Sequence, residues 1–481
     1  MLFNSYFFIF IFLPVAWLGY FALNKYKMVD LAKSWLLGCS LFFYGYYNPS
    51  YLPLILVSIL VNHAITTQLQ NDKNERHKTS LFYFSLCFNL GLLGYFKYMN
   101  FFLDNFSALT TIHLEPLKII LPLGISFYTL QQVAYLIDVY QGVAGEKRFI
   151  DYALFVTFFP YLLSGPIGHY SEIMPQFESL RAKVFNYRNV ALGLFVFTIG
   201  LSKKVLIADT LSGWVSDGYL HPEKLHFFHA WGTSLSYTFQ LYFDFSGYSD
   251  MAIGLGLLFN IKIPQNFNSP FRAGNINDFW ARWHMTLSLF IRTYIFTPLV
   301  KCMPKTTFGY SMIAMFLAMT IAGIWHGAAW TFVIYGMLHG LAIVIHYYWK
   351  KRKKKVNYFL AWLVTFNFVN FTFIIFRSRT LTEAKHVVMG MLGLQGFQFP
   401  KMGISFINKL GAKMGPYMSN DQNLQLIIII VSFILIFKAQ NTSELQESFK
   451  PRKRLAVLTA CMFVICLFGL NRVSEFIYFN F

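Results

Sequence analysis

The sequence predicts an all-α polytopic membrane protein, with about 11 transmembrane helices and re-entrant or interfacial helices between them. Hydrophobic residues make up 56% of the 481 residues and charged residues only 13%, roughly half the charged share of a typical soluble domain. Apolar stretches recur along the whole chain. A soluble protein with an oversized core is the alternative, but a chain this apolar cannot cover a water-facing surface.

The apolar stretches define the predicted helices, because a helix needs about 20 mainly apolar residues to cross a bilayer. The first stretch lacks the basic start and small-residue exit of a cleavable signal peptide, so we expect it to remain as a span. Residues 152–163 and 235–259 are further apolar stretches that polar residues interrupt. The uninterrupted stretches are 2–23, 31–47, 51–69, 81–98, 117–136, 191–207, 311–324, 330–349, 358–376, 424–437 and 455–470.

Basic residues gather in the loops between these stretches and give a formal net charge of +19. The clusters lie at 25–33, 73–78, 350–355 and 450–454. The positive-inside rule places all of them in the cytoplasm, so we expect a cytoplasmic (inner) membrane protein with both termini and residues 377–423 outside. Contact with anionic membrane lipid explains this charge better than nucleic acid does.

The cysteines and histidines give no sign of a metal site. The five cysteines are an odd number without a C-x-x-C pair, so neither a disulfide framework nor a metal site is predicted. His226 and His229 have metal-like spacing, but no acidic or cysteine partner accompanies them. The chain also lacks the P-loop, G-x-S-x-G and dinucleotide-binding signatures, which disfavours those enzyme classes.

The distribution of polar residues among the apolar stretches predicts three parts of the chain. Residues 1–116 read as simple transmembrane hairpins, and 350–481 as C-terminal transmembrane helices with an extracytoplasmic segment. In the central part, 117–349, apolar stretches are interrupted by Asp, Gln, Asn, His and Pro. Such residues are costly in hydrocarbon unless they line a cavity, so the functional centre is expected there.

The first polar motif in this part is YTFQLYFDFSGYSD, residues 237–250. Gln240, Asp244 and Tyr248 are four residues apart, so they share one face of a helix. A buried hydrogen-bond network is the first interpretation. The lining of a substrate tunnel and direct catalysis by Asp244 remain open.

The second motif is NINDFWARWHMTLSLFIR, residues 275–292. Asn277 is expected to cap a helix on which Asp278 and Arg282 pair at i,i+4. On a continuous helix His284 falls on a different, apolar face. A histidine there is either structural or functional, and within a membrane an ionisable residue favours function.

The third motif is GIWHGAAW, residues 323–330. Gly323 and Gly327 form a G-x-x-x-G pattern that admits a close backbone, with His326 and Trp325 inside it. A helix-packing contact with an incidental histidine is one interpretation. A catalytic base is the other, because the pKa of histidine lies near neutral pH. His339 cannot share the helical face of His326 and is interpreted as packing.

These motifs, together with LPLGISFYTLQ (121–131), FFPYLLSGPI (158–167) and NFNSPF (266–271), resemble the membrane-bound O-acyltransferase superfamily. The resemblance is to its bacterial alginate and peptidoglycan O-acetyltransferase branch. It implies that His326 and His284 are catalytic and that a central tunnel links the two sides of the membrane. The tunnel or its support would include Gln240, Asp244, Tyr248, Asp278, Arg282, Trp283, Trp325 and Trp330.

The resemblance also implies the substrates and partners. Acetyl-CoA would be the acyl donor, with no permanently bound cofactor. The acceptor would be a cell-envelope glycan, reached with an extracytoplasmic SGNH-type O-acetyltransferase partner. Two alternatives stay open: D-alanyl transfer to teichoic acid from a carrier protein, and a proton-coupled transporter. The 155 residues after His326 favour the acetyltransferase branch over the D-alanyl branch.

Overall fold

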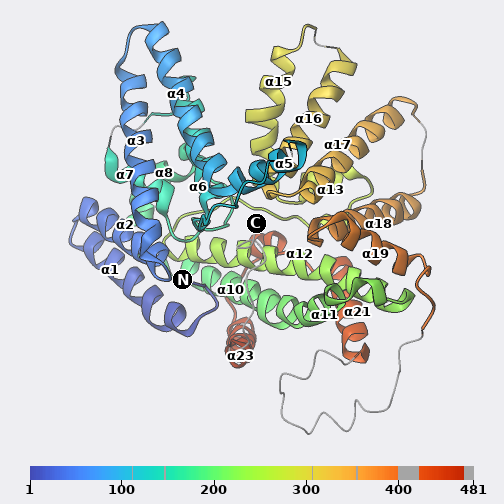
Figure 1. Cartoon of the computed structure of the whole chain (residues 1–481). Coiled ribbons are helices and arrows are strands. Elements are labelled where there is room, and N and C mark those ends of the chain that lie inside the picture. The colour runs from blue at the N-terminus through green and yellow to red at the C-terminus, as the bar shows by residue number, and fades with distance from the viewer. Residues whose placement is uncertain (111, 146–147, 306, 354–355, 399–421, 471–481) are drawn as a thin grey trace. The chain divides into compact units, whose positions relative to one another are not determined.

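The computed structural model describes residues 1–110, 112–145, 148–305, 307–353, 356–398 and 422–470 (Figure 1). Helices and loops make up all of these residues, and no strand occurs among them. The predicted all-α fold class is therefore confirmed. The described residues form two compact units, of which the first comprises those of 1–201, 248–265 and 448–470, and the second those of 202–247 and 266–447.

Seven helical segments are long and apolar enough to cross a membrane, counted by length and composition among the described residues. They are Phe8–Lys25, Pro49–Asn71, Glu75–Thr110, Tyr187–Leu220, Phe308–His326, Trp330–Lys351 and Tyr358–Arg377. Each coincides with a predicted stretch, so the chain is a multi-pass membrane protein. The full count of about 11 is not confirmed, because the remaining stretches form helices of at most 17 residues.

The first unit is built from helical hairpins. Helices α3 and α4 pack on α6, and α1 and α2 lie side by side (Figure 1). The helices are η1 (Phe8–Phe12), α1 (Leu13–Lys25), α2 (Val29–Gly45), η2 (Pro49–Tyr51), α3 (Leu52–Asn71), α4 (Glu75–Leu93), η3 (Gly94–Tyr98), α5 (Met99–Thr110), α6 (Ile125–Tyr140), α7 (Phe149–Thr157), α8 (Tyr170–Glu178), α9 (Leu180–Lys183), α10 (Tyr187–Ser202) and α23 (Lys453–Gly469). Helix α12 (Phe227–Leu258) contributes its last turns.

Buried polar groups tie these hairpins together. The Nδ2 amide of Asn89 on α4 donates to Asn62 on α3 at 2.7 Å, and Ser85 donates to the same Asn62 oxygen. Lys33 on α2 donates to Asp151 on α7 at 2.7 Å. Away from water, each unsatisfied polar group would be costly, so such pairs fix which helices are neighbours.

The second unit surrounds the polar motifs. Its helices are η4 (Lys203–Ala208), α11 (Asp209–Leu220), η5 (Pro222–Lys224), the first turns of α12, η6 (Pro270–Arg272), α13 (Ile276–Arg282), α14 (Met285–Phe290), η7 (Ile291–Phe296), α15 (Thr297–Cys302), α16 (Phe308–His326), α17 (Trp330–Lys351), α18 (Tyr358–Arg377), α19 (Leu381–Met391), α21 (Gln422–Lys438) and α22 (Thr442–Glu447). Helices α16 and α17 form a long antiparallel pair (Figure 1).

Glycines set the spacing of α16 and α17. A Cβ atom at Gly323 would lie 2.4 Å from the Phe332 carbonyl oxygen, and one at Gly336 would lie 2.5 Å from the Met319 carbonyl oxygen. The predicted close helix contact at Gly323 is thereby confirmed. Because the backbones touch here, the end of α16 and the start of α17 hold their side chains at fixed positions.

Two stretches differ from their sequence-based interpretation. Helix α6 begins at Ile125 rather than within the stretch starting at 117, because Gly124 adopts a left-handed conformation with φ of 72°. Helix α12 continues unbroken through the polar residues of 235–259. Residues 399–421 of the predicted extracytoplasmic segment and the C-terminus lie outside the described residues, and the three-part division of the chain stays a prediction.

Candidate active site

His326 is the last residue of helix α16. Gly327 follows in an extended conformation and begins the short connection to α17, where a Cβ atom would lie 2.1 Å from the Phe332 ring. The His326 side chain is 4% exposed and its ring contacts Tyr335 and Phe376, at centroid distances of 6.1 and 5.2 Å. These two aromatic rings pack against the imidazole and hold it at the end of the closely packed α16–α17 pair.

His284 lies at a break between two helices, and not on one continuous helix as the sequence suggested. Helix α13 ends at Arg282 and α14 begins at Met285. His284 itself has φ of 43° and ψ of 54°, in the left-handed region. This conformation costs about 1–2 kcal/mol for a residue with a Cβ atom, and such strain concentrates at functional sites.

Asn266 holds the break in place. Its Oδ1 atom lies 3.3 Å from His284 Nδ1 and accepts from Thr286 Oγ1 at 2.6 Å, while its backbone carbonyl accepts from Met285 N–H at 2.9 Å. Because an amide oxygen accepts, His284 donates from Nδ1, and Nε2 is left as the acceptor nitrogen of the neutral ring. This Nε2 atom is buried and has no hydrogen-bond partner in the described part of the chain.

Trp325 connects the two histidines. Its ring lies 6.3 Å from the His284 ring and 5.0 Å from the His326 ring, measured between centroids. The ring of Phe245 on α12 packs against the His284 imidazole, with 4.8 Å between the ring centroids. The structure therefore brings His284 and His326 into one buried aromatic cluster, although the motifs that carry them are about 40 residues apart in the chain.

His339 is fully buried and has structural partners on both ring nitrogens. Trp280 Nε1 donates to its Nδ1 at 3.1 Å, and its Nε2 lies 3.0 Å from Thr372 Oγ1, which donates to the Val369 carbonyl. The chain of hydrogen bonds ends on a backbone oxygen, which is consistent with the packing role expected for His339.

A buried ion cluster lies on the α12 side of the second unit. Lys204 Nζ is 2.7 Å from both Asp209 Oδ1 and Asp244 Oδ1, and all three side chains are at most 4% exposed. Lys204 lies in the π-helical segment η4, a local widening that is frequent near functional sites. Asp244 precedes Phe245, so this cluster anchors the turn of α12 that contacts His284.

The other predicted residues are more scattered. Gln240 is buried in the second unit, whereas Tyr248 belongs to the first unit, where its ring stacks on Phe3 at 4.8 Å. Trp283 is 2% exposed and packs among aromatic rings, and Trp330 is 56% exposed at the start of α17.

Asp278 and Arg282 form the predicted i,i+4 ion pair at 2.7 Å, and both side chains are 34% exposed. The helix cap was predicted two positions too late. Asn275, and not Asn277, accepts from the Asp278 N–H and begins α13. The ion pair therefore stabilises the short helix that leads into the break at His284.

Three residues of the site were missed. Lys204 lies inside the apolar stretch 191–207, and Asn266 lies within a motif that was noticed only as part of the resemblance. Phe376 ends the stretch 358–376 and looks like any membrane residue. A lysine within an apolar stretch and an asparagine after one were available signals, since both are costly in a membrane without partners.

Comparisons with known proteins identify the family of the chain. The profile of the MBOAT, membrane-bound O-acyltransferase family matches residues 66–381. The peptidoglycan O-acetyltransferase of Helicobacter pylori is 43% identical over all of this chain and 98% of its own. The probable alginate O-acetylase AlgI of Pseudomonas aeruginosa is 35% identical, over 91% of this chain and 81% of its own.

A second group of relatives covers less of the chain. The teichoic acid D-alanyltransferase of Bacillus subtilis is 32% identical over 56% of this chain and 71% of its own. All of these relatives are named as acyl-group transferases, which does not support the transporter alternative. The chain belongs to the membrane-bound O-acyltransferase family and is an acyltransferase.

Proposed function

We propose that this protein moves acetyl groups from cytoplasmic acetyl-CoA across the membrane for O-acetylation of an extracytoplasmic cell-envelope glycan. An SGNH-type transferase outside the membrane is the proposed partner that places the ester on the polymer. The observation that carries the proposal is the buried pair of His284 and His326, which share the ring of Trp325. Such a pair suits acyl transfer, which needs a base and a group that stabilises negative charge.

The extent of the relatives favours acetyl over D-alanyl transfer. The two acetylating relatives match 100% and 91% of the chain, whereas the D-alanyltransferase matches 56%. Peptidoglycan is the acceptor to test first, because the peptidoglycan O-acetyltransferase is more similar to this chain than the alginate O-acetylase is, at 43% against 35% identity. D-alanyl transfer from a carrier protein remains the alternative.

The proposed reaction begins with the acetyl thioester in a central tunnel, with the charged part of the donor kept in the cytoplasm. His326 accepts the proton of the attacking hydroxyl while the new carbon–oxygen bond forms. The carbon–sulfur bond of the thioester then breaks, and the proton passes to the departing thiolate. One positioned base of this kind contributes about 10²–10⁴-fold to the rate.

His284 has the proposed role of orienting the acyl carbonyl. The left-handed backbone and Asn266 fix its ring, so its nitrogen is positioned before the substrate arrives. With the Nδ1 proton donated to Asn266, the neutral ring presents Nε2 as an acceptor. Donation to a developing oxyanion would need a second proton on Nε2, which leaves the bond to Asn266 in place, or the other tautomer, which would require Asn266 to rotate its amide.

The basic loops set the proposed orientation in the membrane. With 25–33, 73–78 and 350–353 in the cytoplasm, the N-terminus lies outside and the loops attract the phosphates of the donor. A cysteine placed at position 353 should therefore be protected from membrane-impermeant reagents in intact cells.

The purified protein should consume acetyl-CoA, slowly alone and faster with its partner and a glycan acceptor. Release of the CoA thiol, followed with a thiol reagent, measures this directly. His326→Ala is the blank for spontaneous hydrolysis. Consumption of a D-alanyl-loaded carrier protein, with acetyl-CoA untouched, would instead support the alternative donor.

Replacements of His284 should separate backbone strain from chemistry. His284→Asn should keep measurable activity, because asparagine tolerates the left-handed region and still offers an amide donor. His284→Gly fits the backbone but removes the ring, and should lose about 10²–10³-fold in kcat. His284→Ala should fall at least as far and also melt at a lower temperature. Equal activity of the Asn and Gly variants would contradict a positioning role.

A further inference from the structure

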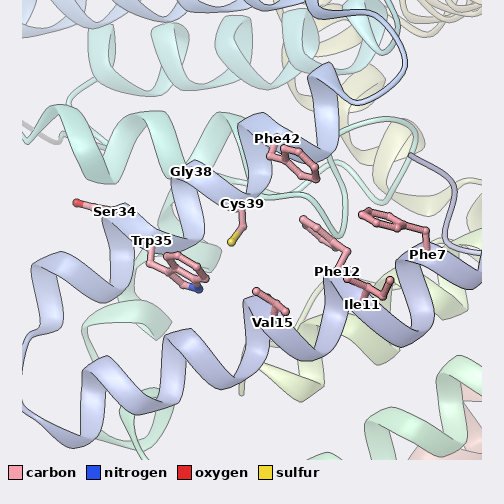
Figure 2. Close-up of a pocket in the computed structure, with 9 residues that line it drawn as sticks. All are labelled: Phe7, Ile11, Phe12, Val15, Ser34, Trp35, Gly38, Cys39 and Phe42. Carbon is pink, nitrogen blue, oxygen red and sulfur yellow. The ribbon is translucent and has the colours of Figure 1, made fainter.

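In the first unit, an apolar groove runs between the continuous helix that η1 and α1 form together and helix α2 (Figure 2). Its volume is about 370 Å³. The lining residues recur three, four or five apart on each helix, as expected for two facing helical surfaces. They are Phe7, Ile11, Phe12 and Val15 from the first helix, and Ser34, Trp35, Gly38, Cys39 and Phe42 from the second.

The groove is open along one side, where its lining residues are exposed. Ile11, Val15 and Phe42 are each 52% exposed, and α1 belongs to a segment that is apolar enough to span a membrane. Large exposed apolar side chains on a membrane-spanning helix are in contact with lipid. The groove is therefore filled by membrane components rather than by water.

The shape of the groove is defined by residues at its floor and ends. Gly38 leaves its floor open, since a Cβ atom there would have no neighbour within 4 Å. Near one end the Trp35 indole donates to the Ala16 carbonyl at 3.1 Å and packs onto Gly19. At the other end the rings of Phe12 and Phe42 stack at 6.1 Å. Phe42 lies seven helical positions after Trp35, so these ends are about 10 Å apart.

A basic loop follows the Trp35 end. Lys25 ends α1 and Lys27 lies in the loop before α2, and both are exposed. The nearby carboxylate of Asp30 is paired with Arg148, so it does not neutralise them. Tryptophan is typical of the membrane–water interface, and Trp35 is about 9 Å along α2 from its first residue. The two lysines therefore lie at headgroup level.

We propose that this groove binds one acyl chain of an anionic phospholipid, with the phosphate of that lipid at Lys25 and Lys27. A lipid tail in the bilayer is already out of water, so the hydrophobic effect does not favour its binding to the groove. The preference of the groove for an anionic phospholipid therefore arises from two other sources. The walls and open floor of the groove give closer van der Waals packing than a flat helix surface does. The lysines favour a negatively charged headgroup over a zwitterionic one.

Filling the groove tests the acyl-chain part of the proposal. Native mass spectrometry of the detergent-purified full chain, titrated with phosphatidylglycerol, should show one retained lipid. Gly38→Leu should lower this occupancy about tenfold, since the leucine takes the place of the chain. Gly91→Leu on α4 is the matched control, because Gly91 is also helical, exposed and open. Unchanged occupancy in Gly38→Leu would overturn the proposal.

Removing the charge tests the headgroup. Lys25→Gln with Lys27→Gln should reduce binding of phosphatidylglycerol about tenfold and leave phosphatidylcholine of the same chain length unaffected. Lys73→Gln in the α3–α4 loop with Arg76→Gln in the first turn of α4 is the control, because both residues are exposed, and it should change neither. Equal loss in both pairs would show a general charge effect and overturn the site. A dimer that dissociates in Gly38→Leu would show that a second copy occupies the groove, which also overturns it.

Discussion

His326→Ala is expected to abolish acyl transfer while the protein remains in the membrane at wild-type amounts. The imidazole is the proposed proton acceptor, and its position at the end of α16 is fixed by the close glycine contacts with α17. Loss of the base should lower kcat by at least about 10²–10⁴-fold. The rate of CoA release by the purified protein and the ester content of the glycan in cells measure the effect.

Two variants make this result interpretable. The His326 ring contacts Trp325, Tyr335 and Phe376, so alanine also leaves a cavity. His326→Gln fills most of that space but cannot accept the proton, and should be as inactive as alanine with a smaller change in melting temperature. His346→Ala is the control and should behave as wild type, because His346 lies on the neighbouring helix α17 but outside the aromatic cluster. Near-normal ester in either His326 variant would exclude the proposed mechanism.

The fold class was predictable because membrane-spanning helices can be recognised by their apolar composition. Every segment long enough to cross the membrane coincides with an apolar stretch of the sequence. The count of spans was less predictable, because helices such as α2 and α21 are apolar yet only 17 residues long. A helix start such as Ile125 depends on one glycine conformation, which hydropathy does not report.

The site was predictable in its residue types and not in its geometry. The motifs indicated His284 and His326, and the ion pair of Asp278 with Arg282 followed from spacing alone. The helical wheel failed for His284, because a left-handed residue ends one helix and begins another. Asn266 supplies the hydrogen bonds that hold this break, and it lies 18 residues away along the chain. Periodicity describes only neighbours within one helix, so it cannot reveal such a partner.

The role of Asp244 illustrates the same limit. The sequence left three interpretations open, namely a buried network, a tunnel lining and direct catalysis. The structure shows the network, because Lys204 lies 2.7 Å from both Asp244 and Asp209. The two carboxylates and one ammonium are buried together, so each charge has an opposite charge beside it.

Lys204→Met is accordingly expected to destabilise the protein strongly. The variant leaves two buried carboxylates without their shared cation, and breaking a buried pair in this way costs about 3–5 kcal/mol. Low yield and an early melting transition in detergent should follow. Arg282→Met is the comparison, because its half-exposed pair with Asp278 should contribute only about 0–1 kcal/mol.

Neutralising the whole cluster should reverse much of this loss. Lys204→Met combined with Asp209→Asn and Asp244→Asn leaves no buried charge, and such replacements are often neutral or stabilising. If the melting temperature of the triple variant is no higher than that of Lys204→Met alone, unpaired buried charge is not the cause of the destabilisation. Its activity then decides between the interpretations of Asp244. If the cluster only anchors Phe245 against His284, acyl transfer should recover together with stability. A stable but inactive triple variant would instead assign Asp244 a direct part in the reaction.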